Sequence, residues 1–277
     1  MSINQTSVGE STYVLGHVDT EIRRLILQAR LYDEFTEHAL RLAGLQPGMR
    51  VLDVGCGPGD VSFVAARLVG PRGSVLGVDV EPDVVELARI RAAEHGLDTV
   101  RFEPTVIGNL RIEEPVDAVI GRLILMHLPD PVSALRHLAE MVRPGGLVAF
   151  CEFDTTGFYS VPDLPLYRAL KDTAAKAFQG AGLDPAFGAK LHTLFGRAGL
   201  GPPRLALGAP LGVADDPDIL AYLVETWRSV FPLAERLGLI PDELTDLDIL
   251  AGRLRDEAVA AQAIAVMPSL ICASTHV

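Results

Sequence analysis

The sequence is poor in positive charge and in cysteine. Its 277 residues contain 24 Lys and Arg against 36 Asp and Glu, which gives a net charge of −12. Proteins that bind nucleic acid or anionic membranes usually carry a basic surface, so we expect neither as a partner. The three cysteines, Cys56, Cys151 and Cys272, lack the C-x-x-C or Cys/His spacing of a zinc site. This usage predicts no structural metal and a reducing, cytoplasmic environment.

Long apolar runs and a recognisable export signal are also missing. The longest apolar stretch, residues 258–273, is interrupted by Gln262 and Pro268 and is too short to span a bilayer. The first residues, MSINQTSVGESTY, combine neither a basic start nor an apolar core. We therefore expect a soluble protein, and its length allows one α/β domain with an appended cap.

The most informative stretch is residues 51–60, VLDVGCGPGD, where an apolar run ends in three alternate glycines. Glycine adopts backbone angles closed to other residues and lets the main chain approach a ligand. A helix that begins at this point turns free N–H groups toward the same place. The dinucleotide fingerprint G-x-G-x-x-G needs its third glycine where this sequence has Asp60. A nicotinamide-dependent oxidoreductase is therefore the less favoured alternative.

Strand and helix patterns alternate on both sides of this stretch. Apolar runs predict strands at residues 50–54, 74–79, 99–102, 116–122, 147–153, 205–211 and 269–274. Helical periodicity predicts helices at about 19–43, 60–69, 83–95, 131–142, 163–181 and 187–198, with two or three more between 215 and 266.

Together with the preceding Asp53, the glycines resemble the cofactor motif of class I S-adenosylmethionine (SAM)-dependent methyltransferases, including the ubiquinone-biosynthesis and small-molecule enzymes. Specific motifs carry the resemblance over about residues 46–155, among them the Pro-Gly-Gly turn at 144–146. It implies SAM as cofactor and S-adenosylhomocysteine as product. In this stretch it implies that the cofactor is bound by Asp53, Gly55, Cys56, Gly57, Gly59 and Asp60.

The resemblance also implies a fold and a division of the chain. The expected fold is α/β, with a Rossmann-like, seven-stranded, mostly parallel sheet, helices on both faces and an antiparallel last strand. Residues 1–45 would form a helical lid and 46–214 the core, with a helical segment at 156–199. Residues 215–265 would form a helical cap and 266–277 the last core strand.

Asp79 ends the second expected strand about 20 residues after the glycine turn, where a carboxylate can accept both ribose hydroxyls. The alternative is that it caps the next helix. The resemblance adds Val80 beside it, and it implies adenine contacts at Val106 and Ile107. Related enzymes carry an aspartate where this sequence has Val106, and Glu103 or Asn109 could replace it.

Further cofactor contacts are implied at two other places. The turn at Arg122 would offer a backbone carbonyl to the methionine amino group. The N-terminal helices would fold over the cofactor and bring Tyr13, His17 and Gln28 to it, unless they only pack on the sheet edge. Arg122 would also repel a cation, so we expect no catalytic metal.

Three residues are candidates for catalysis. His127 lies in the run HLPDP after the fourth expected strand. Glu152 and Asp154 alternate at the end of the fifth strand and share one face, where they could bind substrate or act as a base, or could cap a helix or face solvent. His17 and His192 are weaker candidates for a base.

The sequence thus predicts methyl transfer from SAM to a small, partly apolar metabolite. An Asn/Asp-Pro-Pro-aromatic run, typical of enzymes that methylate bases or glutamine amides, is absent after the fourth strand. The alternative is a SAM-binding relative without methyl-transfer activity. Tyr222, Trp227 and Phe231 would line the substrate cavity or form the core of the cap, and the helices of the cap could pair two copies into a homodimer.

Overall fold

The computed structural model describes residues 18–277, with side chains from Thr20 onward. Its core is a seven-stranded sheet in the order β3-β2-β1-β4-β5-β10-β7. The strands are β1 (Arg50–Val54), β2 (Ser74–Asp79), β3 (Val100–Pro104), β4 (Val116–Arg122), β5 (Val142–Asp154), β7 (Arg204–Gly208) and β10 (Ser269–His276). β10 is antiparallel to β5 and β7, and the pairs among β1 to β5 are parallel. The predicted Rossmann-like fold with an antiparallel last strand is confirmed.

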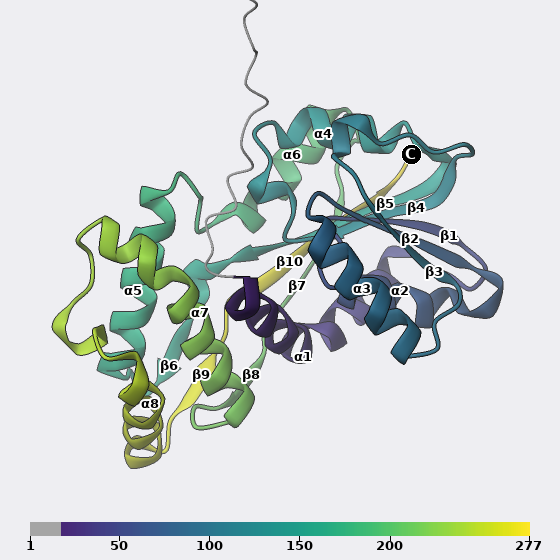
Figure 1. Cartoon of the computed structure of the whole chain (residues 1–277). Coiled ribbons are helices and arrows are strands. Elements are labelled where there is room, and N and C mark those ends of the chain that lie inside the picture. The colour runs from purple at the N-terminus through teal and green to yellow at the C-terminus, as the bar shows by residue number, and fades with distance from the viewer. Residues whose placement is uncertain (1–17) are drawn as a thin grey trace, which may run out of the picture.

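Helices cover both faces of this sheet (Figure 1). One apolar cluster joins α2 (Asp60–Val69), α3 (Pro82–Glu94) and the end of α1 (Val18–Ala43) to one face. A second cluster joins α4 (Pro131–Ala139) and α6 (Leu191–Ala198) to the other. Val51 and Leu52, adjacent on β1, belong to different clusters. Because successive strand residues point to opposite faces and both faces are buried, the strands read as continuous apolar runs.

The glycine stretch forms a tight connection between β1 and α2. Gly55, Gly57 and Gly59 have φ angles of 68°, 52° and 95°, in the left-handed region that favours glycine. A Cβ added to Gly55 would lie 2.6 Å from the Ile124 side chain. The sequence therefore needs glycine here both for the turn and for close packing against the loop after β4.

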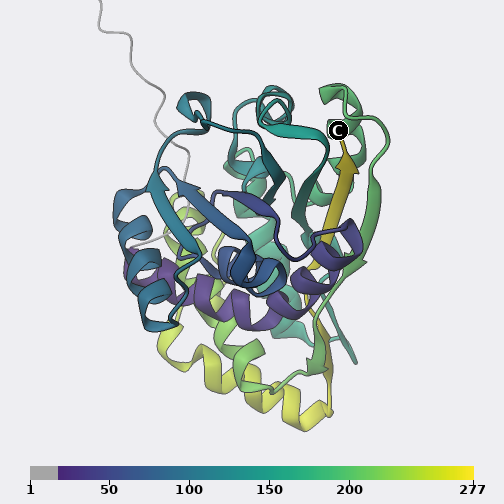
Figure 2. The same cartoon turned by 90° about the vertical axis from the view of Figure 1, so that its right-hand side faces the viewer.

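A cap lies beside the core on the left of Figure 1. It contains α5 (Pro165–Gly180), α7 (Pro217–Arg236), α8 (Leu247–Ala261) and a three-stranded sheet of β6 (Tyr159–Val161), β9 (Ile264–Val266) and β8 (Leu211–Val213). Each small strand follows or precedes a core strand along the chain. Figure 2 shows β9 and β10, in yellow, running end to end along one side of the molecule.

Several predicted boundaries differ from those in the structure; β5, for example, begins at Val142 rather than at Leu147. Two of the differences concern the cap. α5, which the prediction assigned to the core, packs in one apolar cluster with α7 and α8. The expected strand 205–211 ends at Gly208, and residues 211–213 belong to the small sheet. Pro210 lies between them and cannot donate to a strand ladder, which explains the interruption.

α1 is one continuous helix that connects the core with the cap. Arg122 at the end of β4 forms an ion pair of 2.8 Å with Asp33 of α1 and donates to the Thr36 hydroxyl at 2.9 Å. Near its other end, Glu21 accepts a hydrogen bond of 2.9 Å from Ser229 on α7. These contacts hold the helix across the carboxyl edge of the sheet, where ligands bind in α/β folds.

Cys151 on β5 and Cys272 on β10 lie directly opposite each other and form a disulfide. Their separation of 121 residues gave no sign of this pairing in the sequence. The disulfide does not agree with the reducing environment predicted from the cysteines, because disulfides are rare in reducing compartments. None of the helices in residues 18–277 is long and apolar enough to cross a membrane.

Candidate active site

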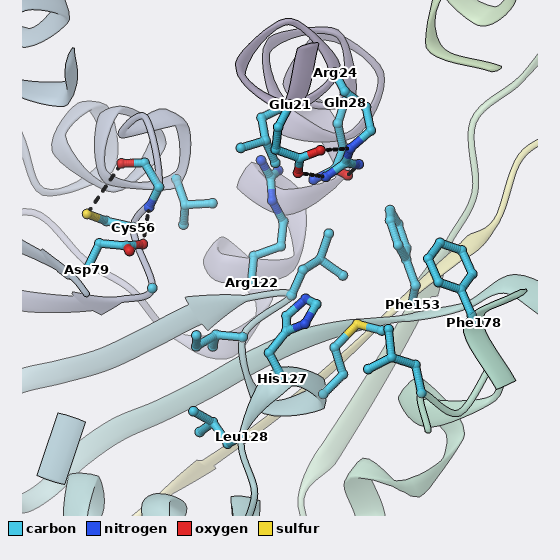
Figure 3. Close-up of a pocket in the computed structure, with 18 of the residues that line it drawn as sticks. Glu21, Arg24, Gln28, Cys56, Asp79, Arg122, His127, Leu128, Phe153 and Phe178 are labelled. Carbon is cyan, nitrogen blue, oxygen red and sulfur yellow. Dashed lines mark hydrogen bonds and ion pairs between the residues drawn. The ribbon is translucent and has the colours of Figure 1, made fainter. Parts of the chain in front are cut away.

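A cavity of about 1160 Å³ lies between the carboxyl edge of the sheet and the cap. Its walls come from α1, the glycine loop, the segments after β2, β3, β4 and β5, and the cap helices α5 and α7. Figure 3 shows Cys56 and Asp79 on one side, Phe153 and Phe178 on the other, and polar residues of α1 between them. We divide the cavity into three parts. The end at the glycine loop and Asp79 is called the cofactor end, because the sequence resemblance implies cofactor binding there. The part beside Glu21, Arg24, Gln28 and His127 is called the junction, and the part lined by α5 and α7 is called the chamber.

Asp79 is held in place at the cofactor end. Its Oδ2 accepts a hydrogen bond of 2.9 Å from the backbone N–H of Gly57, and its Oδ1 accepts one of 3.2 Å from the backbone N–H of Glu81. A Cβ built on Gly57 would meet nothing within 4 Å. A ligand can therefore approach the Gly57 backbone and the Asp79 carboxylate together.

Apolar side chains flank this position. Val80 and Val106 are 45% and 52% exposed, and both line the cavity with Ile107. A planar base packed between them would cover apolar surface that water now contacts. Glu103 and Asn109, the suggested replacements for the missing aspartate, are not among the described residues that line the cavity.

Two acidic residues of the glycine motif support the loop. Asp53 is buried behind it and accepts a hydrogen bond of 2.6 Å from Ser62, while its Oδ1 has no hydrogen-bond partner among the described residues. Burial raises the pKa of Asp53 to about 7. Asp60 lines the cavity and forms an ion pair of 2.7 Å with Arg91, which also donates to the Pro58 carbonyl.

These residues fit SAM, the cofactor that the sequence resemblance implies. The Asp79 carboxylate lies where ribose hydroxyls would bind, the Gly57 backbone is open to a ligand, and the valines offer apolar walls for adenine. The Arg122 side chain is 6% exposed and turned toward α1 by Asp33, so only its backbone can serve the methionine group. Cys56 lines the same wall.

The junction contains a polar network on α1 that the sequence predicted only in part. Arg24 donates to both carboxylate oxygens of Glu21 at 2.9 and 2.6 Å, and to the Gln28 side-chain oxygen at 2.8 Å. All three residues line the cavity and are buried. Gln28 was predicted, whereas Glu21 and Arg24 were missed. Their spacing of three and four residues, which places side chains on one helix face, is the signal that could have identified them.

His127 faces this network from the loop after β4 (Figure 3). Burial, followed by the positive charge of Arg24, lowers the pKa of His127 to about 4. The imidazole is therefore uncharged at neutral pH. It can accept a hydrogen bond from a ligand, but it is a weak base.

The structure corrects the placement of the two predicted carboxylates. Glu152 is fully buried, and its Oε1 accepts hydrogen bonds from the backbone of Ile124 at 3.0 Å and of Leu125 at 2.7 Å. Burial raises the pKa of Glu152 to about 8. Asp154 accepts hydrogen bonds from the backbone and hydroxyl of Thr156. Neither is among the described cavity-lining residues, so Glu152 holds the loop after β4 and Asp154 caps a turn.

The remaining predictions fall outside the cavity or outside the described chain. His192 is exposed on α6 and is not one of the described lining residues. Tyr13 and His17 lie outside the described residues. Residues 18–277 contain no group of three or more His, Cys, Asp or Glu side chains that could hold a metal ion.

The chamber beneath the cap is mainly apolar. Tyr222 and Trp227 of α7 line it and also belong to the core of the cap, so both sequence alternatives hold for them. The Trp227 indole donates to the Leu244 carbonyl at 3.1 Å, which fixes the ring. The other apolar walls are formed by Leu123, Met126, Phe153, Phe158, Leu170, Ala174, Phe178, Leu183, Leu223 and Met267.

Comparison with known proteins agrees with this geometry. Residues 45–194 match the family model described as "Methyltransferase domain". Over 125 residues, 42% of this chain, it is 37% identical to aklanonic acid methyltransferase of Streptomyces sp.. Over 112 residues, 40% of this chain, it is 36% identical to the ubiquinone biosynthesis O-methyltransferase of Xanthomonas campestris. The matches span 54% and 45% of these relatives, about half of each.

Among solved structures, a SAM-dependent methyltransferase from Aquifex aeolicus superimposes with a TM-score of 0.50 at 21% identity. The match covers 70% of this chain and 92% of that one. At this identity the likeness concerns the fold alone.

Proposed function

Since this chain belongs to the methyltransferase domain family, as a class I SAM-dependent methyltransferase, we propose that it methylates a small, uncharged and largely apolar metabolite. The observation that carries the proposal is the continuity of one cavity from the Asp79 and Gly57 cofactor end to the apolar chamber under the cap. The acceptor atom would lie at the junction, beside His127 and Gln28. O-, N- and C-methylation all fit this arrangement.

When bound, SAM supplies a methyl group already activated by its sulfonium. The protein has to align the acceptor with it and to exclude water, which can be worth roughly 7–11 kcal/mol. Asp79 and the glycine loop would fix the cofactor, and Phe153 and Phe178 would hold the body of the substrate. α1 closes the junction through its contacts with Ser229 and Arg122.

The charge balance of the junction supports an uncharged substrate. Glu21 and Arg24 neutralise each other through a bidentate contact. His127 is uncharged because of its lowered pKa, and burial raises the pKa of Tyr222, which keeps its phenol protonated. A substrate carboxylate placed here would lose its hydration without gaining an opposite charge, which is costly.

The chamber rim also favours small molecules without net charge. Lys171 and Asp184 line the cavity, and each has a charged neighbour, Asp172 for the lysine and Lys190 for the aspartate. With a net charge of −12, the protein is poorly suited to bind nucleic acid. We therefore extend the proposal to a small-molecule partner.

The test is a methyl-transfer assay that compares uncharged ring compounds, such as naphthols, with their carboxylate-bearing counterparts. Formation of S-adenosylhomocysteine is followed by mass spectrometry. We expect at least about tenfold higher kcat/KM for the uncharged member of each pair, or about 1.4 kcal/mol. Equal turnover of the charged members would contradict the proposal. SAM binding without transfer to any compound would favour the non-methylating alternative.

A matched pair of variants distinguishes an effect on substrate binding from an effect on cofactor binding. Ala174→Trp would fill the chamber wall formed by α5, whereas Lys176→Trp places the same ring on the exposed side of that helix. Ala174→Trp should abolish turnover of ring compounds and leave SAM affinity unchanged. Lys176→Trp should leave both unchanged. Full activity of Ala174→Trp would show that the substrate does not bind in the chamber.

A further inference from the structure

One surface of the molecule exposes an unusual number of large apolar side chains. They lie on β6, β7, β8 and β9, at the end of the sheet away from the glycine loop. Their exposed fractions range from 38% to 63%. We call this surface the outer strand face, and its members are Tyr159, Val161, Leu205, Leu207, Leu211, Val213 and Ile264.

Strand register places the five members of this face that lie on the small sheet on one side of it. Val161 and Val213 both lie opposite Ile264, and Tyr159 and Leu211 both lie opposite Val266. Residues paired across antiparallel strands point to the same face of a sheet. The small sheet therefore presents one continuous apolar side.

The other side of these strands is covered by helices. A Cβ added to Gly208 would strike Phe35 of α1, and one added to Gly212 would meet Ile219 of α7 at 3.0 Å. Side chains alternate along a strand, so the odd-numbered leucines and valine of β7 and β8 point away from these helices. The outer strand face is thus the uncovered side of an otherwise buried layer.

β7 and β8 are also edge strands, because each ends the order of its sheet. Proteins that act as monomers usually protect such edges with charged side chains, bulges or proline. The only charged residue of the two strands is Arg204, an exposed residue at the start of β7 whose guanidinium donates to the Leu42 carbonyl of α1. Pro210 lies between β7 and β8 rather than within either strand, so it does not block the edge of either one. This surface therefore has the composition of a buried interface.

A second copy of the chain fits the size and chemistry of this surface. From their exposed fractions, the seven residues together expose on the order of 700 Å², against roughly 300–600 Å² for the largest apolar patch on a typical monomer. A standard interface buries roughly 800 Å² per partner. A two-fold contact between identical apolar faces covers both at once. We infer that two copies of this chain form a homodimer by packing their outer strand faces together.

This location differs from the cap helices suggested by the sequence. On α8 the exposed large apolar residues are Ile249 and Val259, ten residues apart. They do not form a continuous face in the described chain, whereas the strand residues do. None of the seven residues of the outer strand face is among the described residues that line the active-site cavity.

The test is the mass of the full-length protein by size-exclusion chromatography with light scattering at micromolar concentrations. We expect twice the mass of the chain. Leu207→Glu combined with Leu211→Glu should give the mass of one chain, because charges cannot be buried at the two-fold contact. Ile90→Glu on α3 and Ile249→Glu on α8 replace residues of similar exposure elsewhere and should remain dimeric.

Circular dichroism of each variant confirms that the fold is retained. A wild-type protein with the mass of one chain would overturn the inference and assign the face to another occupant, such as residues 1–17 or a different protein. A double variant that stays dimeric while folded would also overturn it, because the interface would then lie elsewhere.

Discussion

The backbone N–H of Gly57 donates a hydrogen bond of 2.9 Å to the carboxylate of Asp79, 22 residues further along the chain. This contact joins the glycine loop after β1 to the end of β2 at the opening of the cavity. It leaves the other face of Gly57 open, since no atom lies within 4 Å of where its Cβ would be.

Gly57→Ala should therefore weaken SAM binding by tenfold or more, because a methyl group would project where the cofactor must approach the backbone. The left-handed conformation adds a strain of roughly 1–2 kcal/mol. Gly96→Ala is a matched control, with a φ of 63° and no atom within 4 Å of its Cβ position. Both variants should lose similar thermal stability, but only Gly57→Ala should lose affinity in calorimetry. Equal SAM affinity of the two variants would show that the glycine loop does not contact the cofactor.

Val106 lies at the exposed rim of the cofactor end, at the position where the sequence resemblance implies an aspartate in related enzymes. Val106→Asp should tighten SAM binding by roughly fivefold, about the value of one added hydrogen bond to the adenine amino group. Val106→Ala tests the loss of the apolar wall alone and should weaken binding slightly. If Val106→Asp binds no better than Val106→Ala, adenine does not bind at this rim.

His127 should stay uncharged over the working pH range, because its pKa is lowered to about 4. We expect its NMR signals to show no titration between pH 5.5 and 8, and the pH profile of kcat/KM to lack a step near 6.5. His127→Asn should lower kcat/KM by roughly tenfold, the effect of a lost hydrogen bond rather than of a lost base. A step between pH 6 and 7 that disappears in this variant would restore His127 as the general base.

Glu152 should make the protein less stable as the pH rises. Its pKa is about 8 in the folded protein against 4.5 for the ordinary side chain, so the folded state binds the proton more tightly. The resulting stabilisation is full below about pH 4.5 and is lost as the pH rises toward 8. Asp53, with a pKa of about 7, acts in the same direction.

Glu152→Gln removes this ionisation and keeps an oxygen acceptor for Ile124 and Leu125. Urea unfolding at pH 5 and pH 8 should show a smaller loss of stability in Glu152→Gln than in the wild type, by at least about 1 kcal/mol. Identical pH dependence in the two proteins would show that Glu152 is ionised in the folded state.

The core and the cofactor end followed from local sequence patterns. Glycines at alternate positions, an acidic residue at the end of the next strand and apolar runs of strand length each act within a few residues. Gly57, Asp79 and Val106, which these patterns single out, all line the cavity. The parallel pairing of the first five strands is what such βα repeats produce.

The Glu21–Arg24 part of the junction network, and the place of α5 and the small sheet in the cap, could not be predicted in this way. Glu21 and Arg24 reach the cavity because α1 packs on α7 through Ser229, a contact between residues 208 positions apart. Glu152 looked like a cavity residue because it ends a strand, but its neighbours on the loop after β4 cover it. Such burial depends on tertiary packing, which alternation along one strand does not report.

The most direct test of this account is a calorimetric titration of the purified protein with SAM and with S-adenosylhomocysteine, after mass spectrometry confirms that neither co-purifies. We expect both to bind at micromolar strength, and Asp79→Ala to abolish measurable binding while the protein remains folded. An absence of binding by either compound to the wild-type protein would contradict the assignment of the glycine loop and Asp79 as the cofactor site.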